Sequence, residues 1–132
     1  MTKYKKLDHL KEKLDSFRPL PPEIVSNLHE DLVLRWTYHS NAIEGNTLSL
    51  KETEVVLHHG VTIGGKSLRE HFEAVNHKEG IEFLEKIIAE KQNISEEIIR
   101  KLHGIILRNI DDKEAGAYRR YNVRIMGASF LP

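Results

Sequence analysis

Hydrophobic residues recur every three or four positions along most of the chain, and this spacing is typical of amphipathic helices. A first stripe extends from Leu7 to Phe17 and stops before three prolines at positions 19, 21 and 22. Proline suits the first turn of a helix because that turn leaves backbone N–H groups unused. The pattern therefore predicts two segments, residues 1–20 as an N-terminal helix with a proline-rich joint and residues 21–132 as the main portion.

A second hydrophobic stripe begins after the joint and changes character at its far end. Ile24, Leu28 and Trp36 lie on one helical face, and Ser40 and Glu44 continue the spacing at the polar tip. Gly45 is the expected terminator. A carboxylate in the last turn opposes the helix dipole and costs a few tenths of a kcal/mol. We therefore expect Glu44 either to be solvated or to bind a neighbouring cation, for which arginine has the matching fork.

Three further helix starts follow from serine caps. Ser49 and Ser67 are each followed three residues later by glutamate, which is the pattern of a reciprocal capping box. Ser95 precedes two glutamates that suit a first turn. Apolar residues at helical spacing follow each start. The sequence predicts a mainly α fold.

Near the C-terminus the period changes from helical to alternating. Tyr121, Val123 and Ile125 alternate with polar residues before Gly127 interrupts the run. This pattern predicts one arm of a small β-hairpin.

The amino-acid composition argues against several classes of function. Twenty basic residues balance twenty acidic ones, so we expect no nucleic-acid or membrane partner. The chain has no cysteine, and its first residues lack an apolar signal core, which fits a cytoplasmic protein. Its eight histidines show no metal-binding spacing, and we assign no metal. The arginines at 119, 120 and 124 are either a solvated face or candidates to pair with Glu44.

The segment Ser40-x-x-x-Glu44-Gly45-Asn46 resembles the inhibitory helix motif of Fic family proteins, Ser/Thr-x-x-x-Glu-Gly/Asn. Further stretches look like landmarks of that family in the same order. They are Asn41 to Leu48, Glu54 to Leu57, Gly64 to Glu70, Ala74 to His77, Ala115 to Arg119 and Val123 to Ile125.

The resemblance implies a Fic-like helical bundle and an activity that moves AMP from ATP onto a protein hydroxyl, with ATP and Mg²⁺ required by the complete enzyme. Ser40, Glu44, Gly45 and Asn46 would form the inhibitory site, in which the glutamate pairs with an arginine of the ATP site. A flap hairpin would align the target protein. Its residues are Val123, Arg124, Ile125 and Gly127.

The family's catalytic motif, His-Pro-Phe-x-Asp/Glu-Gly-Asn-Gly-Arg/Lys, is absent from the 132 residues, so we assign no catalytic residue. The resemblance therefore predicts the N-terminal half of such an enzyme, inactive alone and partnered by a catalytic half or a target protein. We also expect self-association through uncovered apolar faces. Two alternatives remain open. One is an antitoxin-like inhibitor that silences a separate Fic chain in trans, and the other is a non-catalytic helical interaction domain.

Overall fold

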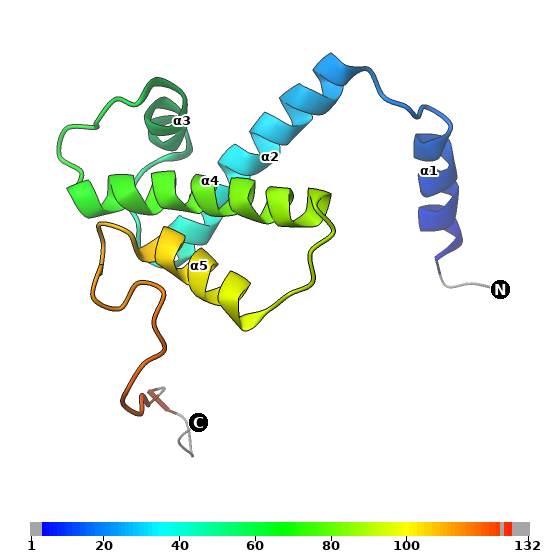
Figure 1. Ribbon diagram of the computed structural model, residues 1–132. Helices are drawn as coiled ribbons and strands as arrows, with labels where there is room; N and C mark the ends of the chain where they lie inside the picture. Colours follow the sequence, from blue (N-terminus) through cyan, green and yellow to red (C-terminus); the bar gives the residue numbers. More distant parts are fainter. Residues whose placement is uncertain (1–3, 125, 128–132) are drawn as a thin grey trace. The chain divides into compact units, whose positions relative to one another are not determined.

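The computed structural model describes residues 4–124 and 126–127, which form five helices (Figure 1). The helices are α1 (Lys5–Asp15), α2 (Pro22–Ile43), α3 (Leu50–His59), α4 (Leu68–Ala89) and α5 (Glu96–Leu107). The expected mainly α fold is confirmed. None of these helices combines the length and the apolar character needed to cross a membrane, as far as the described residues go.

The chain divides into two compact units, Met1–Leu32 and Val33–Pro132. In the first unit, α1 ends before the proline joint and α2 begins at Pro22, as the sequence indicates. The apolar stripe from Leu7 to Phe17, on α1 and the turn after it, is exposed. Helix α2 continues without a break from the first unit into the second, and its second half belongs with α3, α4 and α5.

Serine caps set the starts of the other three helices. Ser49 Oγ accepts the Glu52 N–H at 3.1 Å, and the Glu52 carboxylate accepts the Ser49 N–H at 2.7 Å. Ser67 and Glu70 form the same reciprocal pair at the start of α4. Ser95 Oγ accepts the Ile98 N–H at 3.2 Å and opens α5. Each start lies where the sequence predicts it, because a cap is a local interaction between residues three apart.

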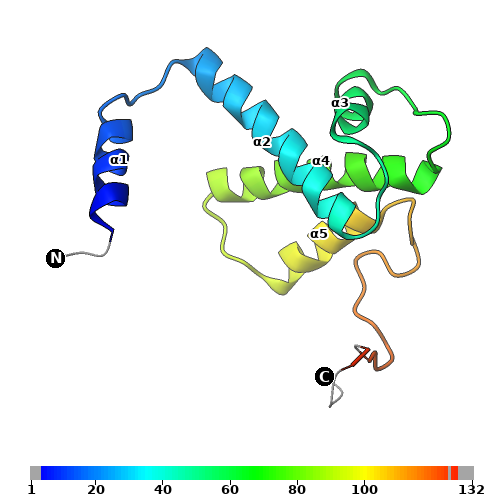
Figure 2. The ribbon, with the colours of Figure 1, turned by 180° about the vertical axis from the view of Figure 1, so that it is seen from behind.

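Helix α4 is the central element of the second unit, with α3 and α5 packed against it (Figure 2). Leu48, Val56 and Ala74 form a buried apolar cluster on the α3 side. On the other side, a Cβ at Gly80 would lie 3.0 Å from the Ile106 side chain. Gly80 therefore permits the close approach of α5, which explains a glycine inside a long helix despite its low helix propensity.

The end of α5 is fixed by two side chains of α4. Asn76 is 1% exposed, and its amide donates to the carbonyl oxygens of Ile106 at 3.1 Å and Arg108 at 2.7 Å. Glu79 forms an ion pair with Arg108. The carbonyls at a helix end lack partners within the helix, so Asn76 satisfies groups that burial would otherwise penalise.

The predicted β-hairpin near the C-terminus is not supported. Residues 121–124 form no strand, and residues 126–127 form a turn. Ile125 lies outside the described residues. An alternating segment becomes a strand only when another strand satisfies its backbone groups, and no such partner is present in the parts of the chain that the structure describes.

Candidate functional site

The end of α2 is a compact turn that presents Glu44 at its tip. The Gly45 N–H donates to the Ala42 carbonyl at 3.1 Å, and the Asn46 N–H donates to the Asn41 carbonyl at 3.0 Å. Gly45 has a φ of +96°, in the left-handed region that glycine adopts without strain. These two bonds and the left-handed glycine form a Schellman motif, in which Glu44 is the C-cap residue. The predicted termination at Gly45 is confirmed.

The Glu44 side chain is exposed, and it forms no ion pair with any described residue. Arg119, Arg120 and Arg124 are also exposed, and among the described side chains none of the three is paired with Glu44. Ser40, one turn earlier, is half-buried. The turn therefore fixes the backbone that carries Glu44, while the carboxylate remains accessible to a cation from outside this part of the chain.

Asn46 ties this turn to α4. Its amide nitrogen donates to the Glu70 carbonyl oxygen at 3.1 Å and to the Glu73 carboxylate at 2.8 Å, while its side-chain oxygen accepts the Leu48 N–H at 2.9 Å. The sequence pattern included Asn46 in the inhibitory motif but did not predict its hydrogen bonds to α4. The structure makes it the residue that fixes the direction in which the chain leaves α2.

Thr47 adds a second link to the start of α4. Its backbone N–H and its hydroxyl donate to Glu70 Oε1 at 2.7 and 2.6 Å. The hydrogen bonds from Thr47, followed by those from Ser67, lower the pKa of Glu70 to about 2. Lys66 Nζ donates to the Thr47 carbonyl at 2.7 Å. Sequence reasoning identified Glu70 only as a capping residue, because nothing in a capping pattern indicates a contact with a residue 23 positions earlier.

The inner face of α2 meets α4 through a polar contact. Thr37 is 0% exposed, and its hydroxyl lies 2.9 Å from His77 Nδ1. The Trp36 ring packs edge-on against the His77 ring, with centroids 5.8 Å apart. Burial lowers the pKa of His77, because desolvation disfavours the imidazolium form. His77 therefore contributes to the packing between α2 and α4.

His71 joins α4 to the glycine-containing loop before it. The ring is 7% exposed, its Nε2 accepts the Ile63 N–H at 2.9 Å, and its Nδ1 lies 2.7 Å from the Ser67 carbonyl oxygen. An amide N–H only donates and a carbonyl only accepts, so the ring is neutral with its proton on Nδ1. Sequence spacing did not single out His71.

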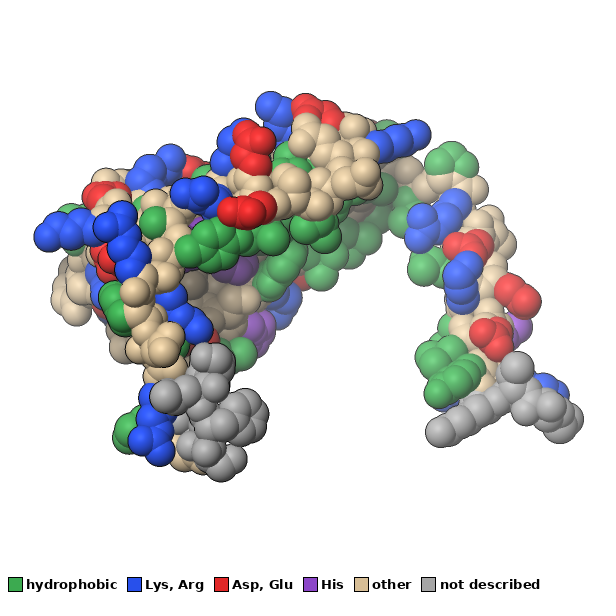
Figure 3. Space-filling model, turned by 60° about the horizontal axis from the view of Figure 1, so that its bottom comes forward, with side chains coloured by type: hydrophobic (Ala, Val, Ile, Leu, Met, Phe, Trp, Pro, Cys, Tyr) green, Lys and Arg blue, Asp and Glu red, His purple; other side chains and the backbone are tan. Residues whose placement is uncertain are grey.

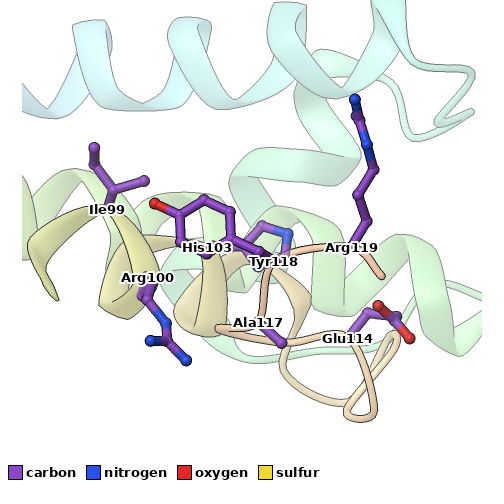
Figure 4. A pocket seen from close by; sticks show the side chains of 7 residues that line it. All are labelled: Ile99, Arg100, His103, Glu114, Ala117, Tyr118 and Arg119. Carbon is purple, nitrogen blue, oxygen red and sulfur yellow. The ribbon is translucent and has the colours of Figure 1, made fainter. Parts of the chain in front are cut away.

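A pocket of about 640 Å³ lies between α5 and the segment that follows it (Figure 4). Arg100 Nε donates to the Gly116 carbonyl at 3.0 Å, and the Gly116 N–H donates to His103 Nδ1 at 3.0 Å. The Arg100 guanidinium lies 5.9 Å from the centre of the Tyr118 ring. Arg119 extends away from Arg100 in Figure 4. These contacts hold residues 114–119 against α5, and none of the inhibitory residues lines the pocket.

The predicted flap residues lie beyond this pocket in a segment without regular structure. Val123, Arg124 and Gly127 are exposed, and Ile125 falls among the residues that are not described. In the described portion of the chain, no three His, Asp or Glu side chains are grouped closely enough to hold a metal ion.

Comparison with known proteins gives a consistent set of relatives, although no family model matches the chain. The sequence is 40% identical over 92 residues to Protein adenylyltransferase fic-1 of Caenorhabditis elegans, covering 68% of this chain and 18% of that protein. The structure of a C. elegans Fic-1 segment matches with a TM-score of 0.74 and 35% identity, covering 87% of this chain and 35% of that one.

A Fic domain containing signaling protein from Bacteroides thetaiotaomicron matches with a TM-score of 0.80 and 31% identity. That match covers 88% of this chain and 44% of the solved one. The chain therefore spans less than a fifth of the nematode protein and less than half of either solved structure.

Proposed function

Because this chain belongs to the Fic family of proteins, we propose that it is the N-terminal, autoinhibitory part of a Fic-type protein adenylyltransferase. The complete enzyme would transfer AMP from ATP to a hydroxyl group of a target protein. Glu44 would inhibit that transfer by pairing with an arginine in the ATP site of the catalytic part. The names of the relatives support the reaction class, and the geometry of α2 supports the inhibitory role.

The observation that carries the proposal is the exposed carboxylate at the capped end of α2. An ion pair stabilises less when both side chains must first lose conformational freedom. A fixed backbone at the inhibitory glutamate reduces that cost. The Schellman turn fixes the backbone on one side of Glu44, and the Asn46 contacts with α4 fix it on the other. A carboxylate carried on this fixed backbone can accept both N–H groups of an arginine fork.

The chemistry itself is assigned to polypeptide outside these 132 residues, which lack the His-Pro-Phe motif. Magnesium bound to the ATP phosphates would neutralise charge that develops during transfer. Mg²⁺ and ATP would bind the catalytic part. We expect no AMP transfer by this chain alone.

The segment around Val123, Arg124 and Gly127 would serve as the flap that docks the target. An extended backbone with free N–H and C=O groups can pair with a target segment by strand addition. The described flap residues are exposed and lie outside any helix, which is compatible with this role. Ile125 belongs to the same proposed site.

Reconstitution tests the proposal. The chain is mixed with the part of C. elegans Fic-1 that follows the matched region, and transfer of labelled AMP to protein is measured. We expect Glu44→Gly to raise the transfer rate at least tenfold. Glu90→Gly is the matched control, because Glu90 is the exposed C-cap residue of α4 and has no proposed inhibitory role. Equal rates for wild type and Glu44→Gly would reject the inhibitory function.

The same mixture separates the two alternative functions. A trans inhibitor would reduce the activity of an already complete Fic enzyme when added to it, and Glu44→Gly would abolish that reduction. A plain helical interaction domain would neither restore nor reduce AMP transfer in any combination.

A further inference from the structure

We propose that the N-terminal unit of this chain is a dimerisation arm. In this arrangement, α1 of one copy packs on the Pro22–Leu32 part of α2 in a second copy, and α1 of the second copy packs on the first copy in the same way. The inference goes beyond the proposed function and does not depend on inhibition by Glu44.

The first observation is the uncovered apolar stripe of α1. Leu7, Leu10 and Leu14 follow one another at three and four residue steps and therefore lie on one side of the helix. Phe17 continues the spacing in the turn after the helix. These four side chains are between 47% and 62% exposed, and α1 contains no buried residue. The helix has an apolar side with nothing packed against it among the described residues.

The second observation is a matching stripe on the first half of α2. Ile24, Leu28 and Leu32 are spaced four residues apart on one face, and they are between 49% and 64% exposed. The first buried residue of α2 is Val33, at which the second compact unit begins. Figure 3 shows hydrophobic side chains gathered on both helices. The N-terminal unit therefore exposes two apolar helix faces that do not cover each other.

Charge and length indicate that these two faces suit one another. Residues 5–18 carry five Lys or Arg and three acidic residues, whereas residues 22–32 carry three acidic residues and neither Lys nor Arg. The two segments are thus of opposite net charge, which favours contact between unlike helices over contact between two copies of the same helix. Helix α1 has 11 residues, and Pro22–Leu32 has as many.

The joint between the helices favours pairing with a second copy over pairing within one chain. Arg18, Leu20 and Pro21 each precede a proline, and a residue in that position is biased away from helical backbone toward an extended one. An extended joint separates two helices instead of turning one back onto the other. A second copy offers both stripes at once. Reciprocal exchange about a two-fold axis covers all four apolar faces and leaves no open end for further association.

Sedimentation equilibrium of the 132-residue chain tests for the dimer. Leu10→Gln and Leu28→Gln should each raise the dissociation constant about tenfold, because each places an amide in an apolar contact. Both leucines are exposed, so neither substitution removes part of a buried core. Ile94→Gln is the matched control, since Ile94 is 84% exposed and lies between α4 and α5. The control should leave the dissociation constant unchanged.

Cross-linking tests which helices meet. The chain has no cysteine, so Leu10→Cys and Leu28→Cys introduce single thiols. Each lies near the middle of its segment, so the two face each other whether the helices run parallel or antiparallel. Oxidation of a mixture of the two variants should give a disulfide-linked dimer containing one chain of each. A mixture of Ile94→Cys and Leu28→Cys should not, and equal yields from the two mixtures would overturn the proposal.

Other occupants of the stripes predict different results. A chain that carries both Leu10→Cys and Leu28→Cys and yields only a cross-linked monomer would show that α1 folds back on its own α2, which would overturn the proposal. A wild-type monomer at every concentration would also overturn it. So would dissociation of the dimer by the following part of C. elegans Fic-1, since that polypeptide would then be the occupant. Glu44→Gly should leave the dimer unchanged, so the dimer and the inhibitory function fail or stand separately.

Discussion

The Thr37 hydroxyl lies 2.9 Å from His77 Nδ1 and joins the inner face of α2 to the middle of α4. The two residues are 40 positions apart in sequence, and the threonine has no exposed surface. The contact lies two helical turns before the tip that carries Glu44. Together with the Asn46 contacts, it fixes the end of α2 on the helix that forms the centre of its unit.

Thr37→Val should lower the free energy of unfolding by about 1–2 kcal/mol, because valine preserves the shape but leaves the buried side of His77 without its partner. Urea unfolding monitored by circular dichroism measures this loss. Thr53→Val is the matched control, since Thr53 is also buried and its hydroxyl donates to the Ser49 carbonyl. In the variant this carbonyl still accepts the backbone N–H of residue 53. The control should therefore cost less. Equal losses of unfolding free energy in the two variants would show that the contact with His77 contributes no extra stability.

Acidification should weaken the contact between α2 and α4. Burial lowers the pKa of His77 below 6.5, so the unfolded chain binds this proton more readily than the folded one. The stability contribution is therefore present above about pH 6.5 and is lost as the pH falls through the folded pKa. Trp36 is the only tryptophan, and its fluorescence reports on the adjacent ring. The change in Trp36 fluorescence on acidification should have a midpoint below pH 6.5 and should vanish in His77→Gln. A transition that survives the substitution would contradict this assignment.

A second acid transition should come from Glu70. Hydrogen bonds from Thr47 and Ser67 lower its pKa from 4.5 to about 2, so this carboxylate stabilises the fold above pH 4.5 and progressively less between pH 4.5 and 2. Glu70→Gln should lower the unfolding temperature at pH 7 and flatten the pH dependence in that range. Glu82→Gln, on the exposed face of the same helix, should change neither quantity. If Glu70→Gln keeps the wild-type pH dependence of stability in this range, other carboxylates cause that dependence.

Two left-handed glycines should respond differently to alanine. Gly45 has φ +96°, and a Cβ added there would meet open space, whereas a Cβ at Gly116, φ +72°, would lie 3.2 Å from the Arg100 carbonyl oxygen. Gly45→Ala should cost about 1 kcal/mol, which is the cost of the left-handed backbone alone. Gly116→Ala should cost more, since the segment must also move away from α5. Chemical denaturation compares the two, and a larger loss at Gly45 would contradict the packing around Gly116.

The sequence predicted those features that depend on neighbouring residues. The starts at Ser49, Ser67 and Ser95 and the end at Gly45 were predicted correctly, because caps and left-handed terminators act over three to five residues. The contact between Thr37 and His77 was not predicted, since helical periodicity identifies a buried face without identifying what it meets.

The hairpin prediction lacks support for a related reason. Alternation around Val123 indicates a segment capable of pairing, but a strand also requires a partner. The family motif located Glu44, Gly45 and Asn46, while only the structure connected Asn46 to Glu73.

The most direct test of the central claim replaces the Glu44 carboxylate by a carboxamide of the same shape. Glu44→Gln is combined with the following part of C. elegans Fic-1, and the rate of labelled AMP transfer is compared with wild type. If a charge at the tip of α2 blocks the ATP site, the glutamine variant should transfer AMP nearly as fast as Glu44→Gly. A rate equal to that of the wild-type mixture, with both mixtures assembled to the same extent, would contradict the account.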